Sequence, residues 1–287
     1  MRGWLFAVVL AALMMLVSAT AASAATPILG SSPDWRTVDG AVPYGTGHAV
    51  PLKAATPAWF SDALAARVDA ANGAPVAAPN DAPLPGEVGI RPGSWMIAPA
   101  GCTMNFVFGS PGAYSIGTAG HCGNVGDEVV LLTVAPGGAN PVLVELGTDQ
   151  KSVNGGIGND FALVSIRPEL QEWVSPTIAV VAGPCGSYSG SGPEPVFHYG
   201  HGLAVGTGGT PRAGLALTWQ ADAFGWSGAA APGDSGSAVR VNTGMQAAGD
   251  LTHLVVDTNW LPSYIAGTRM GRILQIAGQP LANSPLC

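Results

Sequence analysis

Three short segments of this 287-residue sequence carry side chains that can cooperate in nucleophilic chemistry. They are centred, in chain order, on His121, Asp160 and Ser235. A serine hydroxyl is a weak nucleophile at neutral pH and needs a base to accept its proton, and a histidine held by a carboxylate can be that base. The three residues are therefore candidates for a nucleophile, its base and the group that orients the base.

The three residues lie in the motifs Thr118-Ala119-Gly120-His121-Cys122, Asn159-Asp160-Phe161-Ala162-Leu163 and Pro232-Gly233-Asp234-Ser235-Gly236-Ser237. These motifs resemble segments of the chymotrypsin family of serine proteases, and most closely its compact, secreted bacterial members of the streptogrisin type. The resemblance covers roughly residues 89–287, and the order histidine, aspartate, serine is that of the family. It implies a serine endopeptidase in which the backbone N–H groups of Gly233 and Ser235 bind the developing oxyanion.

The orienting carboxylate has other candidates, because Asp127 and Asp149 also lie between the histidine and the serine. Most aspartates are solvated turn residues. Asp160 is favoured by the apolar run that follows it directly at 161–166. In the family, the corresponding aspartate stands at the entry to a buried strand.

The sequence departs from the family near the serine. Ser237 stands where most members have glycine, and no cysteine lies close before Ser235 to brace the specificity pocket. The stretch 89–93, where a mature chain would begin, lacks the usual activation sequence, whose charged N-terminus pairs with the aspartate before the serine. Asp234 therefore needs another partner, such as an arginine or a set of N–H donors, because a lone buried carboxylate is costly.

The side chain preferred before the cleaved bond is predicted by counting back from Ser235 within the resemblance. Trypsin-like members have an aspartate at the base of the pocket, whereas this sequence has Ala229, which offers no charge to a lysine or arginine. Thr252 and His253 stand where the family has its substrate-pairing strand. We expect a preference for medium or large apolar residues. If His253 reaches the pocket, glutamate is the alternative.

The N-terminus has the pattern of a signal peptide over residues 1–24. Met1 and Arg2 precede an apolar stretch at 4–17, and the small residues at 22–24 suit signal peptidase. An uncleaved anchor is the alternative, but the apolar stretch is shorter than the ~20 residues that span a bilayer. We expect secretion to the extracellular space and no stable membrane insertion after cleavage.

Export would place the four cysteines in an oxidising compartment, where they can form two disulfides in three possible pairings. In the family, the cysteine after the catalytic histidine is bonded to one a short distance earlier in the chain. The resemblance therefore favours Cys102 with Cys122, and with it Cys185 with Cys287.

Residues 25–88 are expected to form an N-terminal extension, with the main boundary near residue 88. A helix is predicted over 57–71, where apolar residues recur every four positions. The Pro- and Gly-rich stretch 74–93 predicts an exposed connection. The extension is either a removable pro-region, which would make the chain a zymogen, or an ordered appendage.

Beyond residue 88, short runs with strand character alternate with turn residues, which is typical of an all-β domain. The resemblance implies two packed six-stranded antiparallel β-barrels, about 93–175 and 176–275, with the active site in the cleft between them. A short helix is expected over 269–276. The expected strands cover 103–108, 128–134, 141–146, 161–166, 177–182, 215–221 and 237–241.

The composition argues against several other classes of function. With 47% hydrophobic residues the chain can bury a real core, and its few, scattered basic residues and net charge of −7 make nucleic acid a poor partner. No cofactor or metal is implied: His198 and His201 could share an ion, but the sequence offers no clear third ligand nearby. The expected partners are protein or peptide substrates and the chain's own N-terminal region.

Two rival functions stay in view. A protease homologue that has lost turnover could serve as a binding module, although all three candidate residues are present. An α/β-hydrolase esterase is disfavoured, because residues 233–237 do not fit G-x-S-x-G and strands and helices do not alternate.

Overall fold

In the computed structural model, residues Val38–Cys287 form one compact unit. The expected signal peptide, the expected helix at 57–71 and most of the expected connection at 74–93 lie outside the described residues. The structure describes residues 36, 38–56, 89–134, 141–202 and 209–287.

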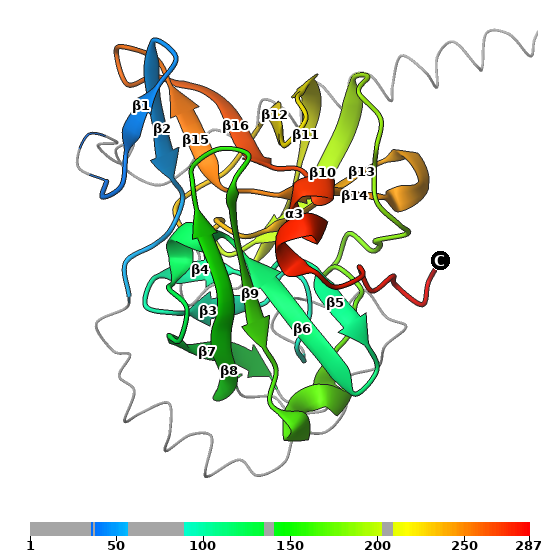
Figure 1. Cartoon of the computed structure of the whole chain (residues 1–287). Coiled ribbons are helices and arrows are strands. Elements are labelled where there is room, and N and C mark those ends of the chain that lie inside the picture. The colour runs from blue at the N-terminus through cyan, green and yellow to red at the C-terminus, as the bar shows by residue number, and fades with distance from the viewer. Residues whose placement is uncertain (1–35, 37, 57–88, 135–140, 203–208) are drawn as a thin grey trace, which may run out of the picture. The chain divides into compact units, whose positions relative to one another are not determined.

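The described residues form two antiparallel sheets, which confirms the all-β prediction (Figure 1). The first sheet has seven strands in the order β4-β3-β7-β8-β9-β6-β5. Its strands are β3 (Trp95–Ile97), β4 (Gly101–Thr103), β5 (Val107–Ser110), β6 (Ala113–Thr118), β7 (Glu128–Val134), β8 (Pro141–Asn154) and β9 (Asp160–Ser165).

The second sheet has nine strands in the order β1-β2-β15-β16-β12-β11-β10-β13-β14. The first two of them come from the N-terminal extension, and Ala54 of the same extension pairs with Gly101 of the first sheet. The strands are β1 (Val42–Tyr44), β2 (Gly47–Pro51), β10 (Glu194–Gly200), β11 (Thr210–Trp219), β12 (Ala223–Gly228), β13 (Ala238–Val241), β14 (Ala247–Asp250), β15 (His253–Val256) and β16 (Pro262–Thr268).

The strands follow the expected apolar runs with some shifts. The run 128–134 is β7 as predicted, and β9 begins one residue before its predicted start. The predicted strand 103–108 is wrong as a single element, because β4 ends at Thr103 and β5 begins at Val107. The three residues between them are buried but belong to neither strand, and the Asn105 N–H donates to the carbonyl of Gly117.

The predicted strand at 177–182 is wrong, because this segment forms a turn in the connection between the two sheets. Val180 and Ala182 have φ values of 60° and 59°, which no strand accommodates. The Ala182 N–H donates to the Ile178 carbonyl, and this bond closes the turn. Ile178 packs into a core cluster with Phe161. Residues 177–179 are buried whereas Val180 is exposed, so the apolar run does not reflect the pairing of a strand.

The helix α3 (Met270–Ala277) forms within one residue of its predicted bounds. Met270, Ile273 and Ala277 are its buried residues, at the spacing of one helical face. Gly278 ends the helix with φ 65°, a conformation that favours glycine. Among the described residues, short 3₁₀ helices include η2 (Gly120–Cys122), η3 (Pro168–Trp173) and η4 (Thr243–Met245).

Two disulfides join distant parts of the fold, with the pairing that the resemblance implies. Cys102–Cys122 links β4 to η2. Cys185–Cys287 fastens the C-terminus across a sequence separation of 102 residues. Within the described ranges, no helix is both long and apolar enough to cross a membrane.

Candidate active site

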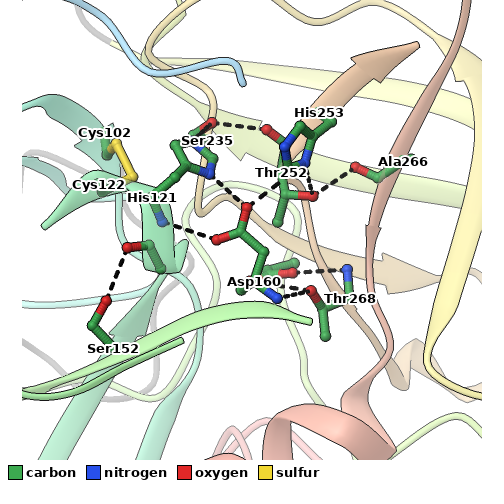
Figure 2. A network of polar contacts seen from close by, with 12 residues as sticks. Cys102, His121, Cys122, Ser152, Asp160, Ser235, Thr252, His253, Ala266 and Thr268 are labelled. Atoms are coloured by element: carbon green, nitrogen blue, oxygen red, sulfur yellow. Dashed lines mark hydrogen bonds and ion pairs between the residues drawn. A yellow bond between two sulfur atoms is a disulfide. The ribbon is translucent and has the colours of Figure 1, made fainter. Parts of the chain in front are cut away.

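The structure brings the three predicted residues into one hydrogen-bonded chain (Figure 2). The distance from His121 Nδ1 to Asp160 Oδ2 is 2.6 Å, and that from His121 Nε2 to Ser235 Oγ is 2.7 Å. All three side chains are buried. The histidine is thus held by a carboxylate on one ring nitrogen and faces a serine hydroxyl with the other.

The position of His121 follows from the pairing of β6 with β9. Thr118, at the end of β6, pairs with Ala162 on β9, so η2 begins beside the start of β9. Gly120 has to be glycine here, because a Cβ atom would lie 2.0 Å from the Val153 carbonyl oxygen. The Ser152 hydroxyl contacts the Gly120 carbonyl at 2.9 Å and braces the same turn (Figure 2).

Asp160 opens β9 and is completely buried. Its Oδ1 accepts a hydrogen bond of 2.9 Å from the backbone N–H of His121, in addition to the ring contact. Burial by itself raises the pKa of Asp160, but the charge and hydrogen bonds of His121, together with the charge of His253, outweigh it and lower the pKa. The carboxylate therefore stays ionised and can stabilise a protonated imidazole.

Asp127 and Asp149, the other two candidates for the orienting carboxylate, have different surroundings. Asp127 lies in a turn, where its Oδ2 accepts a 2.7 Å hydrogen bond from the Asn124 N–H. Asp149 is buried within β8, and burial, with a smaller contribution from the charge of Asp127, raises its pKa to about 7. The carboxylate beside the histidine is that of Asp160.

Ser235 lies in the loop between β12 and β13, which depends on two glycines with positive φ. Gly233 has φ 104° and Gly236 has φ 89°, and a Cβ atom at Gly236 would lie 2.1 Å from the Thr103 carbonyl oxygen. The Thr103 hydroxyl donates to the Gly233 carbonyl at 2.8 Å. The loop is thus fixed against the first sheet.

Asp234 has both kinds of partner that the sequence called for. Arg212 Nη1 lies 2.6 Å from its Oδ1, and the N–H of Gly202 donates to the same oxygen at 2.7 Å. The N–H of Ala231 donates to Oδ2 at 2.8 Å. The fully buried carboxylate is therefore compensated and anchors the loop that carries Ser235.

The N–H groups of Gly233 and Ser235 converge on one oxygen atom. This atom is the backbone carbonyl oxygen of Leu52, 2.5 Å from Gly233 N and 3.2 Å from Ser235 N. Two N–H donors that meet at one carbonyl oxygen next to a serine hydroxyl have the geometry of an oxyanion hole. Sequence reasoning missed Leu52, since nothing in its own segment marks it and its partners lie about 180 residues later in the chain.

Two of the predicted pocket residues, Thr252 and His253, lie next to the candidate triad. The Thr252 carbonyl accepts hydrogen bonds from the Leu52 N–H at 3.1 Å and from Ser235 Oγ at 3.0 Å. His253 Nδ1 lies 2.9 Å from Thr252 Oγ1 and 3.6 Å from Asp160 Oδ2 (Figure 2). Burial lowers the pKa of His253 to about 4, so the ring is neutral at neutral pH.

The third predicted pocket residue, Ala229, contacts His198, one of the two histidines considered above as metal ligands. His198 Nε2 lies 3.3 Å from the Ala229 carbonyl oxygen, and burial lowers the pKa of His198 to about 4. Among the described residues, the groups of three potential ligand atoms that come together are Cys102–His121–Cys122 and His121–Asp160–His253. The two cysteines of the first group form a disulfide, and neither group includes His198 or His201.

No family model and no curated protein matches this sequence. The structure is similar to several solved structures. Thermobifida fusca protease A is 20% identical with a TM-score of 0.45, and the match covers 68% of this chain and 98% of that one. A Nocardiopsis protease is 21% identical with a TM-score of 0.46, with coverage of 68% and 98%. A glutamic acid-specific serine protease described as using a histidine triad in substrate binding is 17% identical, with a TM-score of 0.47 and coverage of 67% and 100%.

Proposed function

We propose that this protein is a serine endopeptidase that hydrolyses peptide bonds through an acyl-enzyme intermediate. The observation that carries the proposal is the chain Asp160–His121–Ser235, which ends beside the carbonyl oxygen bound by Gly233 N and Ser235 N. A nucleophile, its base, the orienting carboxylate and the oxyanion donors are all in place. This completeness argues against a homologue that has lost turnover.

The geometry supports the following steps. His121 Nε2 takes the proton of Ser235 as Oγ attacks the substrate carbonyl carbon, and Asp160 stabilises the imidazolium. The two N–H groups bind the negative oxygen, a kind of contact worth about 10²–10³ in rate per donor. His121 then protonates the leaving amine. Water, deprotonated by the same ring nitrogen, hydrolyses the ester and releases the serine.

Peptides fit the site better than small esters do, because the side of β15 on which β2 lies can pair with an extended chain next to the serine. An extended chain that pairs with β15 gains main-chain hydrogen bonds, which is the usual way in which a sheet edge binds a peptide. The structure shows such a pairing between β2 and β15. The chain then continues past the serine to Ala54, which pairs with Gly101. Binding on both sides of one carbonyl supports cleavage within a chain.

An apolar residue is the preferred one before the cleaved bond. Leu52, whose carbonyl occupies the oxyanion site, is fully buried. A lysine or arginine in its place would lose its hydration without gaining a charged partner from Ala229. Glutamate is disfavoured because His253 is neutral above about pH 4 and its Nδ1 already contacts Thr252.

We further propose that the protein is secreted. The motif at residues 1–24 has the features of a cleavable signal peptide. The two disulfides are of the kind that persists in oxidising compartments.

The test uses covalent labelling and a peptide series on purified protein. A fluorophosphonate should label the wild type and not Ser235→Ala. Peptides that differ only in the residue before the cleaved bond should be cut fastest with leucine, phenylalanine or methionine. If the fluorophosphonate does not label the wild type although its triad is intact, the protein is instead a protease homologue that has lost turnover and serves as a binding module. A tenfold preference for arginine or lysine would show that the pocket is wrongly assigned.

A further inference from the structure

A segment of the N-terminal extension crosses the active site in the manner of a bound peptide. β2 pairs antiparallel with β15, with Val50 opposite Leu254 and Pro51 opposite His253. Figure 1 shows β2 in blue beside β15 in orange. The next residue, Leu52, donates its N–H to the Thr252 carbonyl at 3.1 Å. The pairing thus continues to the residue whose carbonyl lies in the oxyanion hole.

The segment is also bound beyond that carbonyl. The Ala54 N–H donates to the Gly101 carbonyl at 2.8 Å, and the Gly101 N–H donates back to Ala54 at 2.9 Å. Gly101 directly precedes Cys102, which is disulfide-bonded to the residue after His121. The Leu52–Lys53 peptide bond is therefore fastened on both sides, one side by the second sheet and the other by the first.

We propose that the active site cuts the Leu52–Lys53 bond of its own chain, and that residues 47–54 block the site until they leave it. The proposal rests on the function proposed above. It assigns the extension a defined processing site well before the boundary near residue 88 that the sequence suggested. As long as the bond is uncut, the bound segment keeps the chain inactive toward other substrates.

The chemistry balances within the groups present and one water molecule. Ser235 Oγ bonds to the Leu52 carbonyl carbon and its proton passes through His121 to the nitrogen of Lys53, so the C–N bond breaks and a new amino terminus forms at Lys53. Water then attacks the Leu52 ester. Its hydroxyl becomes part of the Leu52 carboxylate, and its proton returns through His121 to Ser235.

The residues of the segment suit this binding mode. Leu52 buries its whole side chain, as the preferred residue before a cleaved bond should. Pro51 has no N–H to donate, and the strand still binds through the residues on either side of it. Gly47 permits the close start of the pairing, since a Cβ atom would lie 1.9 Å from the Val256 carbonyl oxygen. His48 stacks on Trp260, with ring centroids 4.2 Å apart.

The segment inhibits the active site because it occupies the same backbone groups that any other peptide substrate would need. Any other peptide would need the edge of β15 and the N–H groups of Gly233 and Ser235, all of which the segment already uses. Because the segment is covalently attached, it competes at an effective concentration that external peptides rarely reach. After the cut, only non-covalent contacts retain the Leu52 end, and it can be displaced.

The first experiment follows the N-terminus of the purified chain by intact mass and N-terminal sequencing. Wild type should yield a fragment that begins at Lys53, at a rate independent of protein concentration, and Ser235→Ala should stay uncut at this bond. Leu52→Asp should slow the cut at least tenfold. The matched control is Leu217→Asp, the same change at an exposed position on β11, which should be processed normally.

A second variant separates inhibition from cleavage. Lys53→Pro keeps the Leu52 side chain but places a proline ring at the leaving nitrogen. This variant should stay uncut and should react with a fluorophosphonate at least tenfold more slowly than the processed wild type. If it reacts as fast as the processed enzyme, the segment does not block the site.

A peptide assay keeps this proposal distinct from the proposed function. Processed wild type should cut the peptide Gly-His-Ala-Val-Pro-Leu-Lys-Ala-Ala-Thr between leucine and lysine, at least tenfold faster than the same peptide with aspartate for leucine. An enzyme that labels and cuts other apolar peptides, but leaves this bond intact in the peptide and in its own chain, would overturn the processing site alone. A chain that begins at Lys53, and so lacks the blocking segment, but still does not label would overturn the proposed function.

Discussion

Arg212 Nη1 lies 2.6 Å from Asp234 Oδ1, and this ion pair holds the residue that directly precedes the candidate nucleophile. The Arg212 side chain is 15% exposed and the Asp234 side chain is fully buried. An ion pair in such a position contributes mainly by preventing an uncompensated buried charge. The same pair keeps the Gly233 N–H and the Ser235 N–H directed at one point.

Arg212→Gln should therefore destabilise the protein and impair catalysis. Leaving Asp234 without its cation should cost about 3–5 kcal/mol in the free energy of unfolding. The measurement is urea unfolding together with kcat on an apolar peptide. Arg167→Gln is the control, because Arg167 pairs with Glu145 at a partly exposed position and such pairs are worth at most about 1 kcal/mol. Equal losses for both variants would contradict the role given to Arg212.

Asp160→Asn should lower kcat by about four orders of magnitude without unfolding the protein. The amide cannot hold the imidazole in the required tautomer or stabilise the imidazolium. Ser235→Ala and His121→Ala should cost about four to six orders. Asp127→Asn tests the rival assignment and should leave kcat near its normal value. Because these variants would not cut the Leu52–Lys53 bond themselves, each comparison is made on chains that begin at Lys53 and whose circular dichroism matches that of the wild type.

Asp149 should make the protein less stable as the pH rises from about 4 to 7. Burial raises the pKa of Asp149 to about 7 in the folded chain, whereas the ordinary value is 3.8. In that window the folded state binds the extra proton, so the free energy of unfolding falls by up to about 1.4 kcal/mol for each pH unit.

Asp149→Asn should flatten this dependence and make the protein more stable than wild type at pH 8, with little difference at pH 3, below both pKa values. The measurement is urea unfolding across the pH range. Asp222→Asn, at an exposed position, should leave the pH profile of the wild type unchanged. A variant Asp149→Asn with an unaltered slope would mean that the carboxylate is not the group responsible.

The protein should contain no free thiol when purified from an oxidising compartment. Both disulfides connect segments that approach the active site or the chain terminus. Loop entropy makes a bridge across 20 residues worth about 3 kcal/mol. Peptide mapping should recover Cys102 with Cys122 and Cys185 with Cys287. A peptide joining Cys102 to Cys185 would be incompatible with the fold.

The residues that local sequence could identify were those in motifs. His121 and Ser235 lie in short segments whose neighbours are needed for the same chemistry, and Asp160 could be chosen because a buried strand follows it. The helix α3 was predictable because its apolar spacing and the following Gly278 agree. In each case the information lies within a few residues.

The parts that sequence could not supply depend on distant pairing. The turn at 177–182 has the apolar residues of a strand, but the positive φ values of Val180 and Ala182 exclude one, and Ile178 joins the core cluster that contains Phe161. The segment 47–54 carries no signal of its own, since its partners are the edge of β15 and Gly101. His253 likewise acquires its surroundings from Asp160, on the other sheet. Long-range contacts of this kind are invisible to local patterns.

Thr268 and Asp160 join the two sheets at the active site. The Thr268 hydroxyl, on β16, donates to the Asp160 carbonyl at 3.1 Å and accepts from the Asp160 N–H at 3.2 Å. Because the base and its carboxylate come from one sheet and the nucleophile from the other, a displacement of about an ångström between the sheets separates the reacting atoms. Hydrolytic activity should therefore fall as soon as the two sheets move slightly apart, well before either sheet loses its own hydrogen bonds.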